Sequence, residues 1–275
     1  MLLLLPPSEG KTPAPDGAAP LDLAALAHPE LTTQRDLVLD ALAAASARPD
    51  ATTILGVSEG LADEVARNTG LRTAPTAPAA QVYTGVLYAA AGLAHLDGPA
   101  ARRAQESVRI FSGLWGAVAP GDRIPAYRLS MGVTLPDVGP LARAWKPALA
   151  SALDGRAAGD VVVDCRSATY VAAWRPEVSG ADAADWVEVR VLREVDGKRS
   201  VVSHNAKHTR GVLAGHLLRR EAEPTSAEEV LKATQELVGT VLLTEIGSGR
   251  DQTLIEVSLL DGRARGPRTL ELVLA

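Results

Sequence analysis

The chain has 275 residues and a mass of 28.6 kDa, which is long enough to bury a hydrophobic core of ordinary size. Apolar residues make up 47% of it and charged residues 22%, and these proportions exclude a wholly disordered or fibrous chain. The formal net charge of −5 argues against a general basic coat for nucleic acid, so any site for a polyanion must be a local patch.

The first part of the chain predicts one short strand followed by several helices. Residues 2–5 are a short apolar run that predicts a buried strand, and a proline-containing loop follows them. Helices are expected further on, wherever apolar residues recur at helical spacing. The predicted helical segments are residues 21–47 (one or two helices), 58–68, 86–96, 99–108 and 140–153, the last kinked or divided at Pro147.

The second part of the chain adds strands. Residues 161–163 are three consecutive valines, the pattern of a strand buried on both faces. Residues 186–194 alternate and face 199–203 across an Asp196-Gly197 turn, which predicts a hairpin. Further elements are helices at 211–221 and 225–238 and strands at 241–246, 252–259 and 270–274. This mixture, without a long linker or steady βαβ alternation, predicts an α+β fold in which all 275 residues form a single domain around a mixed β-sheet with flanking helices.

The single cysteine, Cys165, directly follows the strand expected at 161–163. One cysteine excludes an internal disulfide framework and suits a reducing compartment. Arg166 beside it could lower the pKa of the thiol and make it a nucleophile or a peroxide sensor. A lone cysteine at a strand end is more often a small buried hydrophobe, and we predict a mostly buried thiol.

No apolar run approaches the roughly 18 residues that span a bilayer. The opening Met-Leu-Leu-Leu-Leu is too short for the core of a signal peptide and lacks a basic flank. We therefore expect a cytoplasmic protein without a membrane partner.

Lys11 follows the first predicted strand in the sequence Gly10-Lys11-Thr12. This sequence is similar to the end of a phosphate-binding P-loop, but that pattern needs a glycine five positions before Gly10, where the chain has Leu5. A lysine at the end of a strand nevertheless stands where α/β sheets place ligand groups. Lys11 is thus a candidate binding residue, and the alternative is a solvated loop lysine.

Two further cations, Lys207 and Arg210, lie between a predicted strand and a predicted helix. Backbone N–H groups at a helix start, together with two cations, make a plausible site for phosphate. The local charge is strongly positive although the chain is acidic. This favours an anion site over a solvated helix start.

Three histidines in the same region, His204, His208 and His216, raise the question of a metal site. A helix could present His204 and His208 on one face, but a zincin would have glutamate at position 205, where the chain has Asn205. His216 would lie about 12 Å further along a helix, so one ion cannot bind all three. We expect no metal, and surface or capping histidines are the simpler interpretation.

Gly113 and Gly116 flank two large apolar residues. A helix-hairpin-helix motif uses a similar Gly-apolar-Gly turn, one residue shorter, to hold a DNA phosphate on backbone N–H groups. The alternative is a packed bend that holds Trp115 and Tyr127. The sequence leaves both interpretations open.

Five short segments form an ordered set of motifs. They are Pro6-Pro7-Ser8-Glu9-Gly10-Lys11-Thr12, Val82-Tyr83-Thr84-Gly85, Phe111-Ser112-Gly113-Leu114-Trp115-Gly116, Pro125-Ala126-Tyr127-Arg128-Leu129-Ser130-Met131-Gly132 and the segment from Ser203 to Gly211. The set resembles the YaaA peroxide-stress family in order and spacing over residues 1 to about 215. Five motifs in order are far more specific than any one alone.

The resemblance implies a cytoplasmic bacterial protein that limits Fenton damage under hydrogen peroxide. It also implies binding of double-stranded DNA through a helix-hairpin-helix and a basic cleft. The DNA- or anion-binding residues of this cleft would be Lys11, Arg128, Lys207 and Arg210. The residues that would line or shape it are Tyr83, Thr84, Ser112, Gly113 and Tyr127.

Competing functions remain open at this point. A DNA-binding stress protein would contact phosphates through lysine and arginine with little base readout. An enzyme or binding protein for a small anionic or nucleotide-like ligand would use the same side chains as a pocket. An iron-handling protein would need a ligand set that the sequence does not offer. No acid–base pair or nucleophile is identifiable, so we expect a binding protein rather than an enzyme, without a cofactor.

Overall fold

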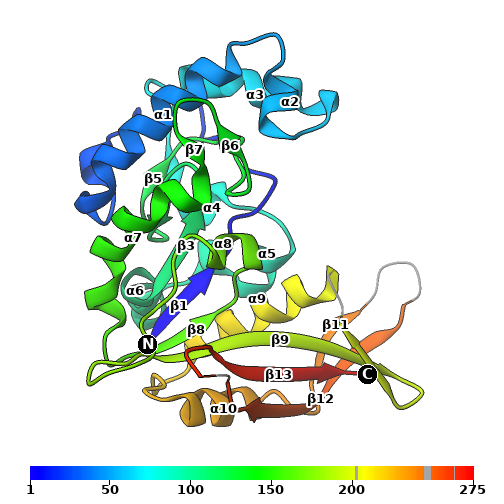
Figure 1. The fold of residues 1–275 in the computed structure, drawn as a ribbon. Helices are drawn as coiled ribbons and strands as arrows, with labels where there is room; N and C mark the ends of the chain where they lie inside the picture. Colours follow the sequence, from blue (N-terminus) through cyan, green and yellow to red (C-terminus); the bar gives the residue numbers. More distant parts are fainter. Residues whose placement is uncertain (202–203, 245–248, 263) are drawn as a thin grey trace.

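The computed structural model describes residues 1–201, 204–244, 249–262 and 264–275, and a mixed β-sheet forms its centre (Figure 1). The strands of this sheet are β1 (Leu2–Leu5), β3 (Val108–Ser112), β4 (Gly116–Val118), β8 (Val161–Asp164), β9 (Asp185–Val195), β10 (Lys198–Val201), β11 (Val241–Thr244), β12 (Asp251–Leu260) and β13 (Arg268–Leu274). Their order is β11-β12-β13-β9-β8-β1-β3-β4, with β10 also paired to β9. The predicted α+β class with a mixed sheet is confirmed.

The middle of the sheet is parallel. Strands β3, β1, β8, β9 and β13 run in the same direction, with Leu3 opposite both Val108 and Val163, whereas β4, β10, β11 and β12 pair antiparallel. Every residue of β1 and β8 is buried, as their apolar runs predict for strands covered on both faces. The carboxyl ends of these parallel strands therefore meet at one edge of the sheet.

Helices flank the sheet, and α1, α2 and α3 gather at the end of the molecule far from β12 and β13 (Figure 1). The α-helices are α1 (Thr32–Ser46), α2 (Ala51–Leu55), α3 (Ala62–Ala66), α4 (Ala79–Val82), α5 (Val86–Ala91), α6 (Gly98–Ser107), α7 (Leu141–Ala157), α8 (Ala168–Val171), α9 (His204–Arg219) and α10 (Ala227–Gln235). Two short pairs complete the strands, β2 (Ala77–Pro78) with β5 (Arg123–Ile124) and β6 (Thr134–Leu135) with β7 (Gly139–Pro140). No helix in the described ranges is long and apolar enough to cross a membrane.

Several predicted boundaries differ from the structure. Helix α7 continues through Pro147 instead of dividing there. Helix α9 begins at His204, seven residues before the predicted start at Gly211. The predicted strands at 199–203 and 241–246 are present as β10 and β11, but residues 202–203 and 245–246 lie outside the described part of the chain.

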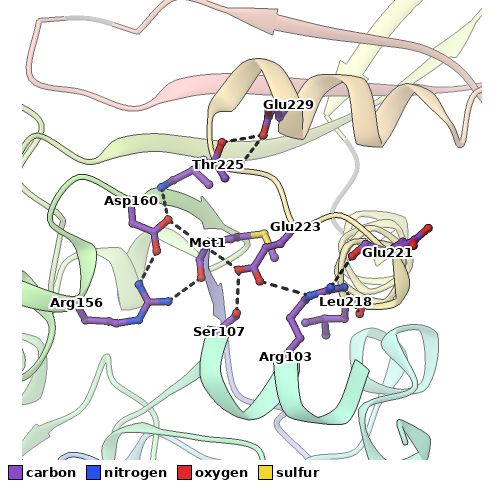
Figure 2. Close-up of polar contacts among 11 residues, drawn as sticks. Met1, Arg103, Ser107, Arg156, Asp160, Leu218, Glu221, Glu223, Thr225 and Glu229 are labelled. Atoms are coloured by element: carbon purple, nitrogen blue, oxygen red, sulfur yellow. Dashed lines mark hydrogen bonds and ion pairs between the residues drawn. The ribbon is translucent and has the colours of Figure 1, made fainter. Parts of the chain in front are cut away.

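An ion-pair network ties the amino ends of β1 and β8 to the segment between α9 and α10 (Figure 2). The Met1 ammonium lies 2.9 Å from carboxylate oxygens of both Asp160 and Glu223. Arg156 donates to the Met1 carbonyl at 2.9 Å and pairs with Asp160, while Arg103 pairs with Glu223 at 3.4 Å. The network fixes the end of the sheet opposite to the carboxyl ends of the strands.

Candidate functional site

A cavity of about 770 Å³ lies at the carboxyl ends of β1 and β8. Residues 6–11, which follow β1, form one part of its wall, and Cys165, Ser167, Thr169 and Tyr170, which follow β8, form another. The remaining wall comes from parts of 55–61, 84–88 and 128–130 and from Lys207 and Arg210. Open α/β sheets place their ligands at this edge.

All four cations predicted for the cleft line this one cavity. Lys11 lies in the loop after β1, Arg128 between β5 and β6, and Lys207 and Arg210 on α9. The tertiary fold thus brings together side chains that are up to 199 positions apart.

The amine of Lys11 is desolvated at the inner wall of the cavity. Its Nζ donates to the carbonyl oxygens of Ser8 at 3.0 Å and Glu9 at 3.3 Å. It also lies 4.4 Å from the centre of the Tyr127 ring, a cation–π distance. Burial, together with the nearby Arg128 guanidinium, lowers the pKa of Lys11 to about 7.

Tyr83, Ser112 and Tyr127 form a buried hydroxyl cluster beneath Lys11. The Tyr127 hydroxyl lies 2.9 Å from that of Tyr83 and 2.6 Å from that of Ser112. Burial raises the pKa of both tyrosines, so the hydroxyls stay neutral and satisfy one another. These three residues and Gly113, together with Thr84, were expected to line or shape the cleft. Thr84 forms part of the cavity wall, and the other four residues are buried.

The segment around Gly113 and Gly116 is a β-hairpin and not a helix-hairpin-helix. Ser112 pairs with Gly116 across β3 and β4, and every residue from 111 to 120 is buried. A Cβ atom added at Gly113 would lie 2.9 Å from the Ser130 carbonyl carbon. Backbone N–H groups here cannot reach a DNA phosphate. The packed bend is the correct interpretation, since the Trp115 and Tyr127 rings meet edge to face at 5.8 Å.

Arg128 is positioned by a residue that the sequence did not reveal. The side-chain amide of Asn68 accepts from the Arg128 N–H and donates to the Arg128 carbonyl, both at 2.9 Å. The guanidinium donates to the Glu9 carbonyl at 2.8 Å and lies 3.4 Å from the Glu64 carboxylate. Asn68 is fully buried, so its hydrogen bonds hold the backbone of Arg128 in place.

Lys207 and Arg210 belong to the first turns of α9 and do not precede the helix. The Arg210 guanidinium donates twice to the Val189 carbonyl of β9, at 2.7 and 3.2 Å. Lys207 is exposed, with its Nζ 3.8 Å from the Glu9 carboxylate. Gly211 lets α9 approach α5 closely, because a Cβ atom there would lie 2.2 Å from a backbone oxygen of α5.

Other hydroxyl groups complete the wall. Ser8 Oγ accepts from the Thr84 N–H at 3.0 Å, and Tyr88 donates to the Pro6 carbonyl at 2.7 Å. Tyr170 lines the wall beside Ser130, and burial raises its pKa. Ser8 and Ser130 belong to the recognised motifs, whereas Tyr170 could have been found only from its place just after a buried strand.

Cys165 is fully buried, as predicted. Burial raises the pKa of its thiol to about 12, although the Arg210 charge opposes this rise. The thiolate that a peroxide sensor requires is therefore disfavoured.

His216 of α9 contacts the end of α10. His216 Nε2 lies 2.9 Å from the Ala233 carbonyl and 3.0 Å from the Glu236 carboxylate. Burial lowers the pKa of His208, and the side chain of His204 lies outside the described residues. In the part of the chain that the structure describes, no group of three or more His, Cys, Asp or Glu side chains could hold a metal ion.

Comparison with known proteins identifies the family. The sequence model described as "Peroxide stress protein YaaA" matches residues 1–237. The chain belongs to this family. A UPF0246 protein of Streptomyces coelicolor is 47% identical over 239 residues, which cover 86% of this chain and 90% of the relative. A UPF0246 protein of Corynebacterium efficiens is 43% identical over 259 residues, 92% and 98% of the two chains.

A more distant UPF0246 protein, from Cereibacter sphaeroides, is 35% identical over 226 residues, covering 78% of this chain and 84% of the relative. All three of these relatives are bacterial. The YaaA family match extends beyond residue 215, where the resemblance in the sequence motifs ends, and includes α10.

Proposed function

We propose that this YaaA-family chain serves the peroxide-stress response in the bacterial cytoplasm by binding a small phosphate-bearing ligand in the cavity. The observation that carries the proposal is the convergence of Lys11, Arg128, Lys207 and Arg210 on one cavity. Its volume of about 770 Å³ falls within the range of roughly 300–1,000 Å³ that is usual for small-molecule sites.

The two sides of the cavity differ in chemistry, which supports a nucleotide-like ligand. The cations and hydroxyl groups would bind the phosphate, since charge-assisted hydrogen bonds are the strong ones. Apolar side chains line another part of the wall, namely Leu55, Val57, Leu61 and Leu129. They suit an apolar or aromatic part of the same ligand.

Double-stranded DNA is the second candidate ligand. Exposed Lys207 supports it, because a side chain that is 58% exposed can reach a duplex phosphate. The other cations support the small ligand better: Arg128 is only 17% exposed, and the Arg210 guanidinium is bonded to a backbone carbonyl. A duplex needs cations that protrude along its backbone. With either ligand, the expected physiological outcome is less Fenton damage under hydrogen peroxide.

Two measurements on the same preparation separate these ligands. We expect a thermal-shift screen of nucleotides and other phosphate compounds to find stabilising ligands. Arg210→Ala should lose at least about tenfold in affinity, since a hydrogen bond to a charged group contributes about 1.5–3 kcal/mol. Lys232→Ala, which changes an exposed lysine on α10, is the matched control and should bind like the wild type.

Duplex binding titrated against salt tests the alternative. Lys207→Ala should then weaken binding to all sequences alike and reduce the salt slope by roughly 1. Duplex binding at about 50 mM salt without any nucleotide-induced thermal shift would overturn the small-ligand proposal in favour of DNA.

A further inference from the structure

Lys11 differs from the other lysines in its surroundings. Lys146, Lys198, Lys207 and Lys232 are all exposed, whereas Lys11 is partly buried and lines the cavity. It is therefore the lysine that a bound ligand would contact in a desolvated setting.

Backbone and ring contacts fix the position of this amine. The Ser8 and Glu9 carbonyls accept two of its hydrogens, and the Tyr127 ring lies on another side. Among the described residues, no carboxylate forms an ion pair with Nζ within 4.0 Å. The charged groups that act on it are Arg128, which disfavours the ammonium form, and Glu64 and Glu9, which favour it.

These surroundings favour the unprotonated form of the amine near neutral pH. With the pKa of Lys11 at about 7, roughly half of the molecules carry the unprotonated amine at that pH. A solvated lysine with a pKa near 10.4 would carry it in fewer than roughly 0.1% of molecules. The unprotonated amine is the nucleophile, and burial beside another cation is a known way to produce it.

We propose that Lys11 is a nucleophilic residue that forms an imine with a small phosphorylated aldehyde or ketone bound in the cavity. The nitrogen lone pair attacks the carbonyl carbon, and a carbinolamine forms. The carbonyl oxygen then leaves as water with the two amine hydrogens, and a C=N bond replaces the C=O bond. The step consumes no oxidant or reductant. It rests on the proposed function, because Arg128, Lys207 and Arg210 would bind the phosphate of the same molecule.

The test uses pyridoxal 5′-phosphate as the probe, because it carries both a phosphate and an aldehyde. Incubation of the full chain with the probe and sodium cyanoborohydride should convert an imine into a stable amine, which peptide mass spectrometry locates. At pH 7 we expect Lys11 to be labelled at least tenfold faster than any exposed lysine. The labelling rate should rise with pH around a midpoint near 7, following the pKa of Lys11.

Pyridoxine 5′-phosphate, which has an alcohol in place of the aldehyde, is the matched control ligand. It should give a thermal shift but no label. Lys11→Arg should keep much of the thermal shift with pyridoxine 5′-phosphate and lose the fast labelling by pyridoxal 5′-phosphate. Lys146→Arg should keep both the thermal shift and the fast labelling of Lys11. Labelling of exposed lysines with Lys11 unmodified overturns the imine proposal, even if pyridoxine 5′-phosphate binds. If neither phosphate compound shifts the melting temperature and Lys11 is unlabelled, the imine proposal fails, and the thermal-shift screen of nucleotides decides the proposed small-ligand function separately.

Discussion

Replacing Gly211 with alanine should destabilise the protein, although alanine is the better helix former. Gly211 lies in the interior of α9, where that helix packs on α5. A Cβ atom at this position would lie 2.2 Å from the Leu87 carbonyl oxygen and 2.9 Å from the Ala90 Cβ. Carbon atoms in good van der Waals contact are about 3.5–4.0 Å apart, so the two helices must separate.

The expected magnitude follows from two opposing effects. Alanine in place of glycine in a helix interior contributes up to about 1 kcal/mol of stability. Overpacking costs about 1–3 kcal/mol, and the upper part of that range applies because the contact is with backbone that cannot rotate away. We expect the free energy of unfolding to fall by about 1–2 kcal/mol. The shift of α9 should also weaken ligand binding, because this helix carries Lys207 and Arg210.

Urea denaturation followed by circular dichroism measures the effect. With a slope of about 3 kcal/mol per molar urea, the midpoint should fall by roughly 0.3–0.7 M. Gly155→Ala in α7 is the matched control, because nothing lies within 4 Å of an added Cβ atom there. That variant should be unchanged or slightly stabilised. A Gly211→Ala protein as stable as the Gly155→Ala protein would refute the close packing of α9 on α5.

Four further predictions concern buried or paired groups. Cys165, whose thiol has a pKa raised to about 12 by burial, should react with iodoacetamide at pH 8 only after unfolding in urea, and fast reaction of the native protein would contradict this. Cys165→Ser should leave peroxide protection intact. Asp164→Asn should lower the free energy of unfolding, measured in urea, by about 3–5 kcal/mol, because it removes the charge partner of buried Arg166; a loss under about 1 kcal/mol would argue against this role. Partial burial raises the pKa of Asp160. Hydrogen bonds from Arg156 and the N-terminal ammonium lower this pKa by a larger amount, so the net pKa is below the ordinary value. The ionised Asp160 carboxylate therefore stabilises the fold at neutral pH, and this stabilisation is lost as pH falls through the acid range. The melting temperature of the wild type should fall between pH 7 and pH 3 for this reason, and that of Asp160→Asn should lack this part of the fall.

Local sequence patterns were sufficient for two strands that carry the site. The valines at 161–163 and the leucines at 2–5 leave no polar face, which predicts strands buried on both sides, and these are the two strands at the base of the cavity. Lys11 follows one of these strands directly, so its place at a ligand-binding edge could be expected before any contact was known. The ordered motifs also pointed to the family.

The tertiary structure alone decided which side chains reach the cavity and which are buried beneath it. Tyr83, Ser112 and Tyr127 belong to the same motifs as the cations, yet their hydroxyl groups pair with one another and leave the wall to Thr84 and Lys11. The segment at 110–119, with its two glycines, fits a turn in either kind of hairpin, and only its pairing within the sheet made it a buried β-hairpin.

Asn68 gave no signal in the sequence, because its partner Arg128 is 60 positions away. Periodicity along a chain indicates which side of a helix or strand is apolar. Desolvation, and with it the lowered pKa of Lys11, depends on atoms contributed by segments far apart in sequence, which only the folded structure places together.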